Sequence, residues 1–347
     1  MNPILVEAMR GGLCESAHRG AVAVCDADGA LVLALGDVER PIFPRSAVKV
    51  LQALPLVESG AADQLGLGDE EIAIACASHN GEPRHTAVVE RMLARAGLDL
   101  GALECGTQWP TREAVQRQMA AAGIQPDALN NNCSGKHAGF LCVACRMSGG
   151  VDLRRYAKGY VGAEHPVMRA VAAALQAATG FDLSQTASGT DGCSIPTYAI
   201  PLRHLALAFA RVGTGVGLSA GHAAAAKRLR SAVARHPFMV GGTDRFDTRV
   251  METVGERVFC KVGAEAVFCA ALPERGLGVA IKIDDGNNAR AAEVAMAATI
   301  EALLDLDDAD ATFMRGLSDL TLRNWNGIEV GALRATDALR DPLRGAR

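Results

Sequence analysis

The stretch that decides the fold is Val258–Ile283, VFCKVGAEAVFCAALPERGLGVAIKI, which reads as two apolar strands joined by a tight turn. Pro273-Glu274-Arg275-Gly276 interrupts the apolar residues with residues that favour turns. A second hairpin is predicted near the other end of the chain, where the apolar runs 21–25 and 30–35 flank Asp26-Ala27-Asp28-Gly29. Because its two runs are continuously apolar, we expect the 21–35 hairpin to be largely buried, and we expect the 258–283 hairpin to supply central strands of the sheet.

The residues between the two hairpins read mostly as helices. We predict helices over 46–59, 84–97, 112–123, 136–147, 164–179, 199–211 and 218–235, a strand-like run over 70–77, and a closing helix over 289–304. Pro55 should kink the first helix. Strands at both ends with a helical region inserted suit an α/β (α+β) protein in which a central, mostly antiparallel sheet is flanked by helices, as in serine β-lactamase-like folds. We expect a single domain over 1–334 and a loose polar tail over 335–347.

The composition excludes several classes of protein. The chain has 347 residues, 49% of them hydrophobic and 21% charged, which is typical of a globular protein. A net charge of −4 without a Lys/Arg-rich run argues against nucleic acid as a partner. No apolar stretch approaches the roughly 18 residues of a membrane span, and the first residues do not read as a secretory signal. We therefore expect a cytoplasmic protein whose ten cysteines are core residues, metal ligands or reactive thiols rather than disulfides.

Three short motifs occur in a fixed order along the chain. They are Ser46-Ala47-Val48-Lys49, Ser78-His79-Asn80 and Lys261-Val262-Gly263, of the forms S-x-x-K, S-x-N and K-x-G. Each could occur by chance, with Lys49 on a solvated helix face, the second motif in a plain turn and Lys261 on a water-facing strand. Together they indicate an active-site serine hydrolase of the β-lactamase, penicillin-binding or glutaminase type, in which a lysine activates the serine.

The chemistry requires these residue types. Ser46 and Lys49 are three positions apart, so their side chains can meet on one side of a helix. A lysine acts as a base only if burial or a nearby positive charge, such as Arg45 or Lys261, lowers its pKa. Ser78 can pass a proton to the leaving amine, and Asn80 can hydrogen-bond an amide. Lys261 can hold a carboxylate or lower the pKa of Ser78.

A second group of residues could bind a metal. Cys133 and Lys136 are one helical turn apart in Asn131–Gly139, and Cys193 follows in Asp191-Gly192-Cys193. A thiolate is a good zinc ligand, whereas lysine is a rare one and must be neutral. The spacing alone does not establish a zinc site, because two cysteines sixty residues apart are usually unrelated.

These segments resemble the Rhizobium etli-type L-asparaginases, a class of asparaginase II enzymes distinct from the threonine-dependent and plant-type enzymes. The resemblance spans residues 5 to 332 and rests on residues 43–49, 76–82, 131–140, 191–193 and 261–265. It implies a β-lactamase/glutaminase-like fold, a homodimer, and an amidohydrolase that converts L-asparagine to L-aspartate and ammonia.

The resemblance also implies roles for individual residues. Ser46 would be the nucleophile and Lys49 its base, with Ser78 and Lys261 as a second serine–lysine pair, although either serine could attack. One zinc ion, tuning substrate binding more than chemistry, would be held by Cys133, Lys136 and Cys193. Substrate contacts would come from Arg45, Asn80, His137 and Asp191.

Other activities are compatible with the same motifs. A glutaminase or a β-lactam or peptide hydrolase would use the same serines and lysines. A non-catalytic zinc-binding protein would keep the fold and the metal without releasing ammonia. A thiol enzyme would attack with Cys133 instead of a serine.

Overall fold

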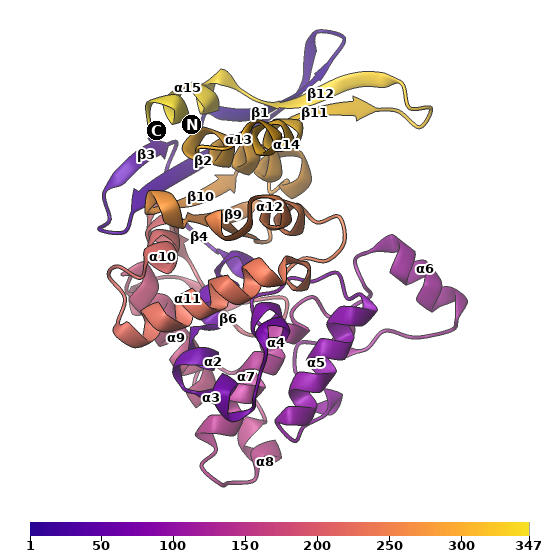
Figure 1. The fold of residues 1–347 in the computed structure, drawn as a ribbon, viewed down its shortest axis with the longest axis vertical. Coiled ribbons are helices and arrows are strands. Elements are labelled where there is room, and N and C mark those ends of the chain that lie inside the picture. Colours follow the sequence, from indigo (N-terminus) through magenta and orange to yellow (C-terminus); the bar gives the residue numbers. More distant parts are fainter. Residues whose placement is uncertain (347) are drawn as a thin grey trace. The chain divides into compact units, whose positions relative to one another are not determined.

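The computed structural model describes residues 1–346, which form two compact units (Figure 1). The sheet unit comprises Met1–Ala47, Ile200–Val216 and the chain from Cys260 onward. The helical unit comprises Val48–Ala199 and Gly217–Phe259. Both ends of the chain, together with residues 200–216, thus build the sheet unit, and the rest of the middle builds the helical unit. The single domain over 1–334 stays a prediction.

The sheet unit contains an eight-stranded sheet. Its order is β11-β12-β1-β2-β10-β9-β8, with β3 paired to β2, and the pairings from β11 to β9 and between β2 and β3 are antiparallel. The bounds are Ile4–Arg10 (β1), Leu13–Asp26 (β2), Leu31–Leu35 (β3), Phe259–Val262 (β8), Val267–Leu272 (β9), Leu277–Ile283 (β10), Asp319–Arg323 (β11) and Glu329–Ala335 (β12). An antiparallel sheet within a mixed α/β chain is therefore confirmed.

Both predicted hairpins form, with two corrections. The strand β3 is mostly exposed rather than buried, because it pairs only with β2. The run predicted as one strand over 258–272 is divided into β8 and β9, and β8 lies at the end of the strand order rather than at its centre. Between β2 and β3, one carboxylate oxygen of Asp26 accepts the backbone N–H groups of Asp28, Gly29 and Ala30 at 2.9–3.0 Å. These side-chain bonds add to the backbone hydrogen bonds of the turn, in which the Asp26 N–H donates to the Ala30 carbonyl at 3.1 Å. Between β9 and β10, the chain turns through Pro273–Arg275 and reverses at Gly276, whose φ of 66° suits glycine.

Helices cover the strands within the sheet unit. The helix α10 (Leu202–Thr214) packs on β10 and β2, and a Cβ at Gly278 would collide with the backbone of Ala206 and Ala210. The helices α13 (Glu293–Leu303) and α14 (Asp308–Ser318) lie beside β12 and β11 (Figure 1). The short strand β4 (Pro41–Ile42), just before the first motif, pairs with β7 (Ile200–Pro201).

The prediction of a loose tail over 335–347 is wrong for the described residues. Ala335 ends β12, and Asp337–Gly345 form the helix α15, which packs against β1 and α13. Leu339 and Leu343 are fully buried because their spacing of four places them on one helix face. Arg347 lies outside the described residues.

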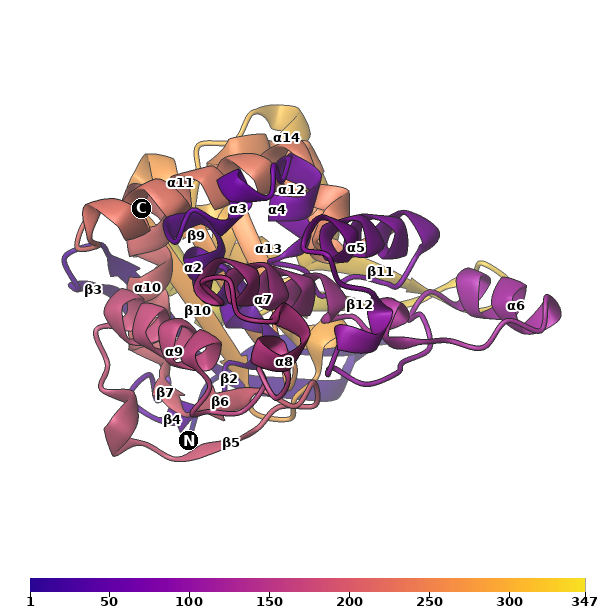
Figure 2. The ribbon, with the colours of Figure 1, turned by 90° about the horizontal axis from the view of Figure 1, so that it is seen from below.

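The helical unit is arranged around one buried helix, α7 (Ser134–Met147), in which residues 134–144 are all buried. Figure 2 shows α5 and α9 on either side of α7, and contacts with both helices agree. The other bounds are Lys49–Gln52 (α1), Leu54–Glu58 (α2), Ala61–Gln64 (α3), Asp69–Ile74 (α4), Pro83–Arg95 (α5), Glu113–Ala121 (α6), Leu153–Ala157 (α8), Pro166–Thr179 (α9), Ala220–Arg235 (α11), Phe246–Val254 (α12), Ser188–Thr190 (β5) and Pro196–Tyr198 (β6).

Two of the predicted elements of this unit take a different form in the structure, and α8, α12 and the β5–β6 pair were not predicted. The helix predicted over 46–59 is divided into a 3-10 turn (Arg45–Val48), α1 and α2, because Pro55 lies in the first turn of α2 and cannot continue a helix from α1. The strand-like run 70–77 is instead mostly the helix α4. Glu71 accepts the backbone N–H of Gly68 at 3.1 Å, which caps the start of that helix.

No helix among residues 1–346 is both long and apolar enough to cross a membrane. The cytoplasmic location stays a prediction. All ten cysteines are free thiols, as expected.

Candidate active site and metal centre

In the sheet unit, Ser46 lies in a strained turn. The preceding residue, Arg45, has a φ of 52°, a left-handed conformation that costs free energy for any residue except glycine. The N–H of Ala47 donates to the carbonyl of Pro44 at 3.1 Å and closes the turn around Ser46. Ser46 itself is partly exposed. Since strain of this kind is concentrated at functional sites, it supports the selection of Ser46 as a candidate.

The K-x-G motif lies against the same turn. A Cβ on Gly263 would be 2.7 Å from the Pro44 carbonyl oxygen and 3.1 Å from the Ala47 nitrogen, so a larger residue would displace backbone. Lys261, on β8 as predicted, is fully buried and donates from Nζ to the carbonyl of Val262 at 2.6 Å. The first and third motifs therefore meet within the sheet unit.

Asn288 hydrogen-bonds to Gly263, and no motif in the sequence points to it. Its Nδ2 donates to the Gly263 carbonyl at 3.2 Å, while its buried Oδ1 has no hydrogen-bond partner among the described residues. Asn288 begins a π-helical turn (Asn288–Ala292), a geometry often found at functional sites. Only the polar run Asp284–Asn288 marks this place in the sequence, and it reads as an ordinary turn.

In the helical unit, Lys49 is fully buried and hydrogen-bonds to the second motif. Its Nζ lies 2.9 Å from Ser78 Oγ and donates to the carbonyls of Ala77 at 2.5 Å and Asn132 at 3.5 Å. Burial, and then the positive charge of Lys136, lower the pKa of Lys49, whereas Cys133 opposes the shift. Lys49 thus has the environment expected of a lysine base.

A backbone segment missed by sequence reasoning supports the S-x-N motif. The N–H groups of Ser78 and Asn80 donate to the carbonyls of Val240 and Gly241, both at 2.9 Å. The guanidinium of Arg245 adds bonds to the Ser78 carbonyl at 3.4 Å and to Asn80 Oδ1 at 3.2 Å. No local pattern links residues 240–245 to residues 78–80, which are about 160 positions away in the chain.

The Asn80 side chain is already engaged. Its Nδ2 donates to the Thr243 carbonyl at 3.1 Å and to Glu82 at 3.4 Å, and its Oδ1 accepts from Thr111 at 2.9 Å as well as from Arg245. A contact with substrate would replace one of these bonds. The proposed substrate contact of Asn80 therefore rests on the motif and the resemblance, and not on a free side-chain group.

The predicted metal ligands come together in the helical unit. Cys133 is the N-cap residue of α7, and Lys136 lies in the first turn, as the spacing predicts. Lys136 is buried and its Nζ lies 3.0 Å from the sulfur of Cys193. The Cys133 sulfur lies 2.9 Å from Asn132 Oδ1.

The charges of this cluster depend on one another. The neighbouring Cys193 thiol and then the positive charge of Lys49 and Lys136 lower the pKa of Cys133 well below its usual value, against the effect of burial. Sharing a hydrogen bond with the Cys133 thiolate, and burial, raise the pKa of Cys193 far above its usual value. Burial disfavours charged Lys136, but the two cysteines outweigh burial and raise its pKa overall. The surroundings therefore favour a negative charge on Cys133 over one on Cys193.

The three side chains have the chemistry of a zinc site. Two sulfur donors and one amine leave a fourth tetrahedral position for another ligand. Lysine would have to lose its proton on binding, which a metal cation favours. Among residues 1–346, no group of three or more His, Cys, Asp or Glu side chains could hold a metal, so any zinc site at Cys133 and Cys193 depends on Lys136.

The two remaining candidates flank this cluster. The His137 ring is fully buried and its Nδ1 lies 2.6 Å from the Tyr160 hydroxyl, whereas Nε2 has no hydrogen-bond partner within the described part of the chain. Burial and then the charges of Lys136 and Lys49 lower its pKa well below the usual value, so His137 is neutral. Asp191 accepts the N–H of Gly192 at 2.7 Å, and its charge favours protonated Lys136.

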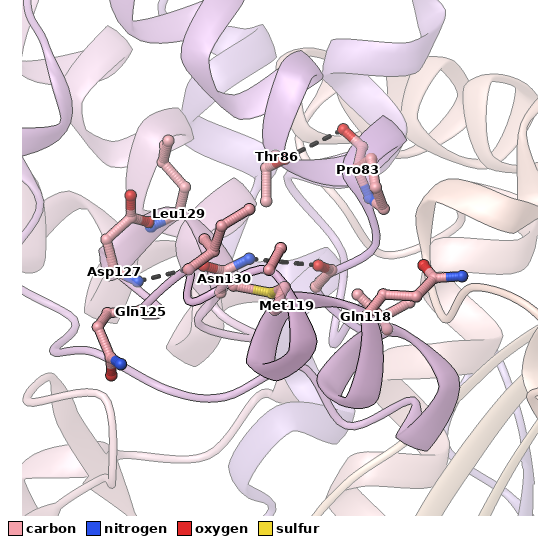
Figure 3. Close-up of a pocket in the computed structure, with 12 residues that line it drawn as sticks. Pro83, Thr86, Gln118, Met119, Gln125, Asp127, Leu129 and Asn130 are labelled. Atoms are coloured by element: carbon pink, nitrogen blue, oxygen red, sulfur yellow. Dashed lines mark hydrogen bonds between the residues drawn. The ribbon is translucent and has the colours of Figure 1, made fainter.

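A separate apolar cavity of about 480 Å³ lies in the helical unit between α5 and α6 (Figure 3). Figure 3 shows Met119 from α6 on the opposite side from Pro83 and Thr86 of α5. None of the predicted catalytic, substrate or metal residues lines the cavity, so it is not part of the candidate site.

The structure therefore supports two groups of predicted residues. Lys49, Ser78, Cys133, Lys136 and Cys193 form one network in the helical unit. Gly263 lies against the turn of Ser46, at Pro44 and Ala47, in the sheet unit, which also contains Lys261 and Arg45. The hydrogen-bond partner of Ser78 in this network is Lys49, and its pairing with Lys261 stays a prediction.

Comparisons with known proteins agree with the motifs. The sequence profile of the family described as L-asparaginase II matches residues 6–335. No curated protein sequence matches the chain. Two crystal structures of Mglu, one in its tris and glutamate form, are 18% identical with TM-scores of 0.37 and 0.38. Each alignment covers 89% of this chain, and 65% and 74% of the respective Mglu chains. At such TM-scores the similarity to Mglu supports no conclusion about this chain.

Proposed function

The chain belongs to the L-asparaginase II family, and we propose that it hydrolyses L-asparagine to L-aspartate and ammonia by a serine–lysine mechanism on a β-lactamase/glutaminase-like fold. The family membership supports an amidohydrolase. The choice of asparagine and the roles of individual residues are the proposal. The observation that supports it most is the hydrogen bond of 2.9 Å between the buried Lys49 Nζ and Ser78 Oγ.

In the first half of the reaction, Lys49 Nζ removes the proton of Ser46, and Ser46 Oγ attacks the side-chain amide carbon of asparagine. A neutral amine is needed for this step, and the burial of Lys49 favours that form. The tetrahedral intermediate collapses as the carbon–nitrogen bond breaks. Ser78 passes a proton from Lys49 to the leaving nitrogen, and ammonia departs from an acyl-enzyme on Ser46.

In the second half, water replaces ammonia. Lys49, neutral again, takes a proton from the water molecule, whose oxygen attacks the acyl carbon. The bond to Ser46 breaks, the serine regains its proton from Lys49, and aspartate leaves. Lys261 and Arg45 are the positive charges proposed to hold the negative groups of substrate and intermediates.

We propose that Cys133, Lys136 and Cys193 hold one zinc ion. Bound there, zinc would supply a Lewis-acid contact for a polar group of the substrate. The low pKa of the Cys133 thiolate suits a metal ligand. Zinc content measured by elemental analysis is expected to fall in Cys133→Ser and Cys193→Ser and to persist in Cys145→Ser, a cysteine of α7 outside the cluster.

The test is ammonia release from L-asparagine and, separately, from L-glutamine by the wild type and by Ser46→Ala. Ser184→Ala is the matched control, because Ser184 is an exposed serine of the helical unit outside the candidate site. We expect release from asparagine that Ser46→Ala loses and Ser184→Ala keeps. Near-normal turnover by Ser46→Ala would refute the nucleophile, and a preference for glutamine would refute the substrate.

The low pKa of Cys133 favours one alternative, a thiol enzyme that attacks with this cysteine. Iodoacetamide treatment of Ser46→Ala separates the two candidates. Under our proposal this variant has no activity for the reagent to remove. Activity that survives in Ser46→Ala and disappears on alkylation would support attack by Cys133.

A further inference from the structure

The outermost strand of the sheet, β11, has a free edge. It pairs with β12 on one side, and no strand of residues 1–346 pairs with the other. Edges of this kind can add a strand from another chain, and proteins commonly block them with charged side chains, above all lysine, or with proline. The sequence of β11, Asp319-Leu320-Thr321-Leu322-Arg323, contains no lysine or proline, and its two charged residues are of opposite sign, so they can attract rather than repel a suitable second strand. Beyond its end the hairpin exposes Trp325 fully and Ile328 by 59%.

The sequence of β11 is complementary to itself when two copies run antiparallel. With Thr321 opposite Thr321 of a second copy, Asp319 lies opposite Arg323 and Leu320 lies opposite Leu322. The arrangement repeats on the other side of the two-fold axis, as a symmetric interface requires. Opposed residues in antiparallel strands share a face of the sheet, so opposite charges meet on one face and leucines on the other.

The charges already present on the sheet extend this complementarity. Across β1, β12 and β11, Glu7 is opposite Arg334 and Arg334 is opposite Asp319, with Glu7 and Arg334 paired at 3.4 Å. Arg323 is opposite Glu329 at 3.8 Å. In the joined sheet, the signs along this row would alternate from Glu7 through Arg334 and Asp319 to Arg323 and then Glu329 of the second copy.

The apolar face supports the same register. Leu320 is opposite Leu333, which is opposite Ala8. Leu333 and Ala8 are buried, whereas Leu320 is 40% exposed because the row ends at β11. Pairing with Leu322 of a second copy would continue the row and remove apolar surface from water.

We propose that β11 is a dimerisation surface, at which it pairs antiparallel with β11 of a second copy of this chain. The two sheets then become one continuous sheet across a two-fold axis at Thr321. The homodimer implied by the family resemblance names no surface, and this proposal is independent of the catalytic mechanism.

Charge reversal tests the proposed register on the full-length protein. Asp319→Arg places two arginines opposite each other, and Arg323→Asp places two acids opposite each other. We expect the wild type to be a dimer by light scattering at micromolar concentration and each variant to dissociate with a Kd raised about tenfold or more. Mixing the two variants restores both opposite-charge pairs, so native mass spectrometry should show a heterodimer.

Glu113→Arg on α6 is the control, because it makes the same charge change as Asp319→Arg at an exposed residue outside the sheet unit. A monomeric wild type, or a dimer that both single reversals leave intact, would overturn the proposal. If a variant does not fold, the wild type still decides the matter by hydrogen exchange. Protection of amides 319–323 should then rise with protein concentration, and protection independent of concentration would contradict a β11 interface.

Discussion

The two units hold their motif residues in different ways. In the sheet unit, the turn of Ser46 is shaped by backbone, through the left-handed Arg45 and the close approach of Gly263 to Pro44 and Ala47. In the helical unit, Lys49 is held by a buried network of polar side chains and carbonyls whose pKa values depend on one another. Steric changes should therefore damage the first unit most, and changes of charge the second.

The largest effect is expected from Lys49→Met, which keeps the length of the side chain and removes the base. General base catalysis contributes about 10² to 10⁴ in rate, so kcat should fall by at least about a hundredfold. Steady-state ammonia release measures it. Lys227→Met, at an exposed lysine of α11, should leave kcat unchanged. Equal rates for Lys49→Met and Lys227→Met would show that Lys49 is not the base.

The steric side of the comparison is tested by Gly263→Ala. Its new methyl group would lie 2.7 Å from the Pro44 carbonyl oxygen, so the turn of Ser46 must move. A displacement of about 1 Å at a catalytic group costs on the order of a hundredfold in rate. Gly316→Ala is the matched control, because a Cβ there meets no atom within 4 Å. Similar kcat values for the two variants would contradict the steric account.

Much of the fold was predictable because its signals are local. The hairpins at 21–35 and 258–283 follow from apolar runs and turn residues, and Pro55 marks the break between α1 and α2. The run 70–77 misled because its apolar residues resemble a buried strand, although Asp69, Glu70 and Glu71 are typical of a helix start. The helix α15 was missed because its segment is mostly charged. Leu339 and Leu343, which it buries, are too few to show a helical period in the sequence.

The candidate site was predictable where its residues belong to short sequence motifs. Cys133 and Lys136 meet Cys193 in the structure, as the family resemblance implies. Arg245 and Asn288 could not be found in this way. They act on Asn80 and Gly263 through contacts between distant parts of the chain, and neither belongs to a motif with a chemistry of its own.

The pH dependence of kcat/KM tests whether the surroundings of Lys49 in the helical unit lower its pKa. Since burial lowers the pKa of Lys49, the amine becomes neutral at a lower pH than an exposed lysine. We expect kcat/KM to fall as the pH drops through this lowered pKa, because protonated Lys49 cannot accept the Ser46 proton. A profile whose acid limb lies at the usual pKa of lysine, about 10.4, would contradict an activated Lys49.

The smallest effect is expected from Asn288→Ala, which removes one neutral hydrogen bond to the Gly263 carbonyl. Such a bond contributes about 1 kcal/mol, so kcat should fall about fivefold with little change in KM. Asn288→Gln, which retains an amide, should recover part of the loss, and the exposed Asn326→Ala is the control. An unchanged kcat in Asn288→Ala would show that its hydrogen bond to Gly263 does not contribute to catalysis.

The central claim is that Ser46 carries the acyl group, and acid quenching during turnover of L-asparagine followed by peptide mass spectrometry tests it most directly. We predict one aspartyl group on the peptide that contains Ser46, and none on that peptide in Ser46→Ala. An aspartyl group on Ser78 or Cys133 instead would contradict the account and identify the residue that attacks.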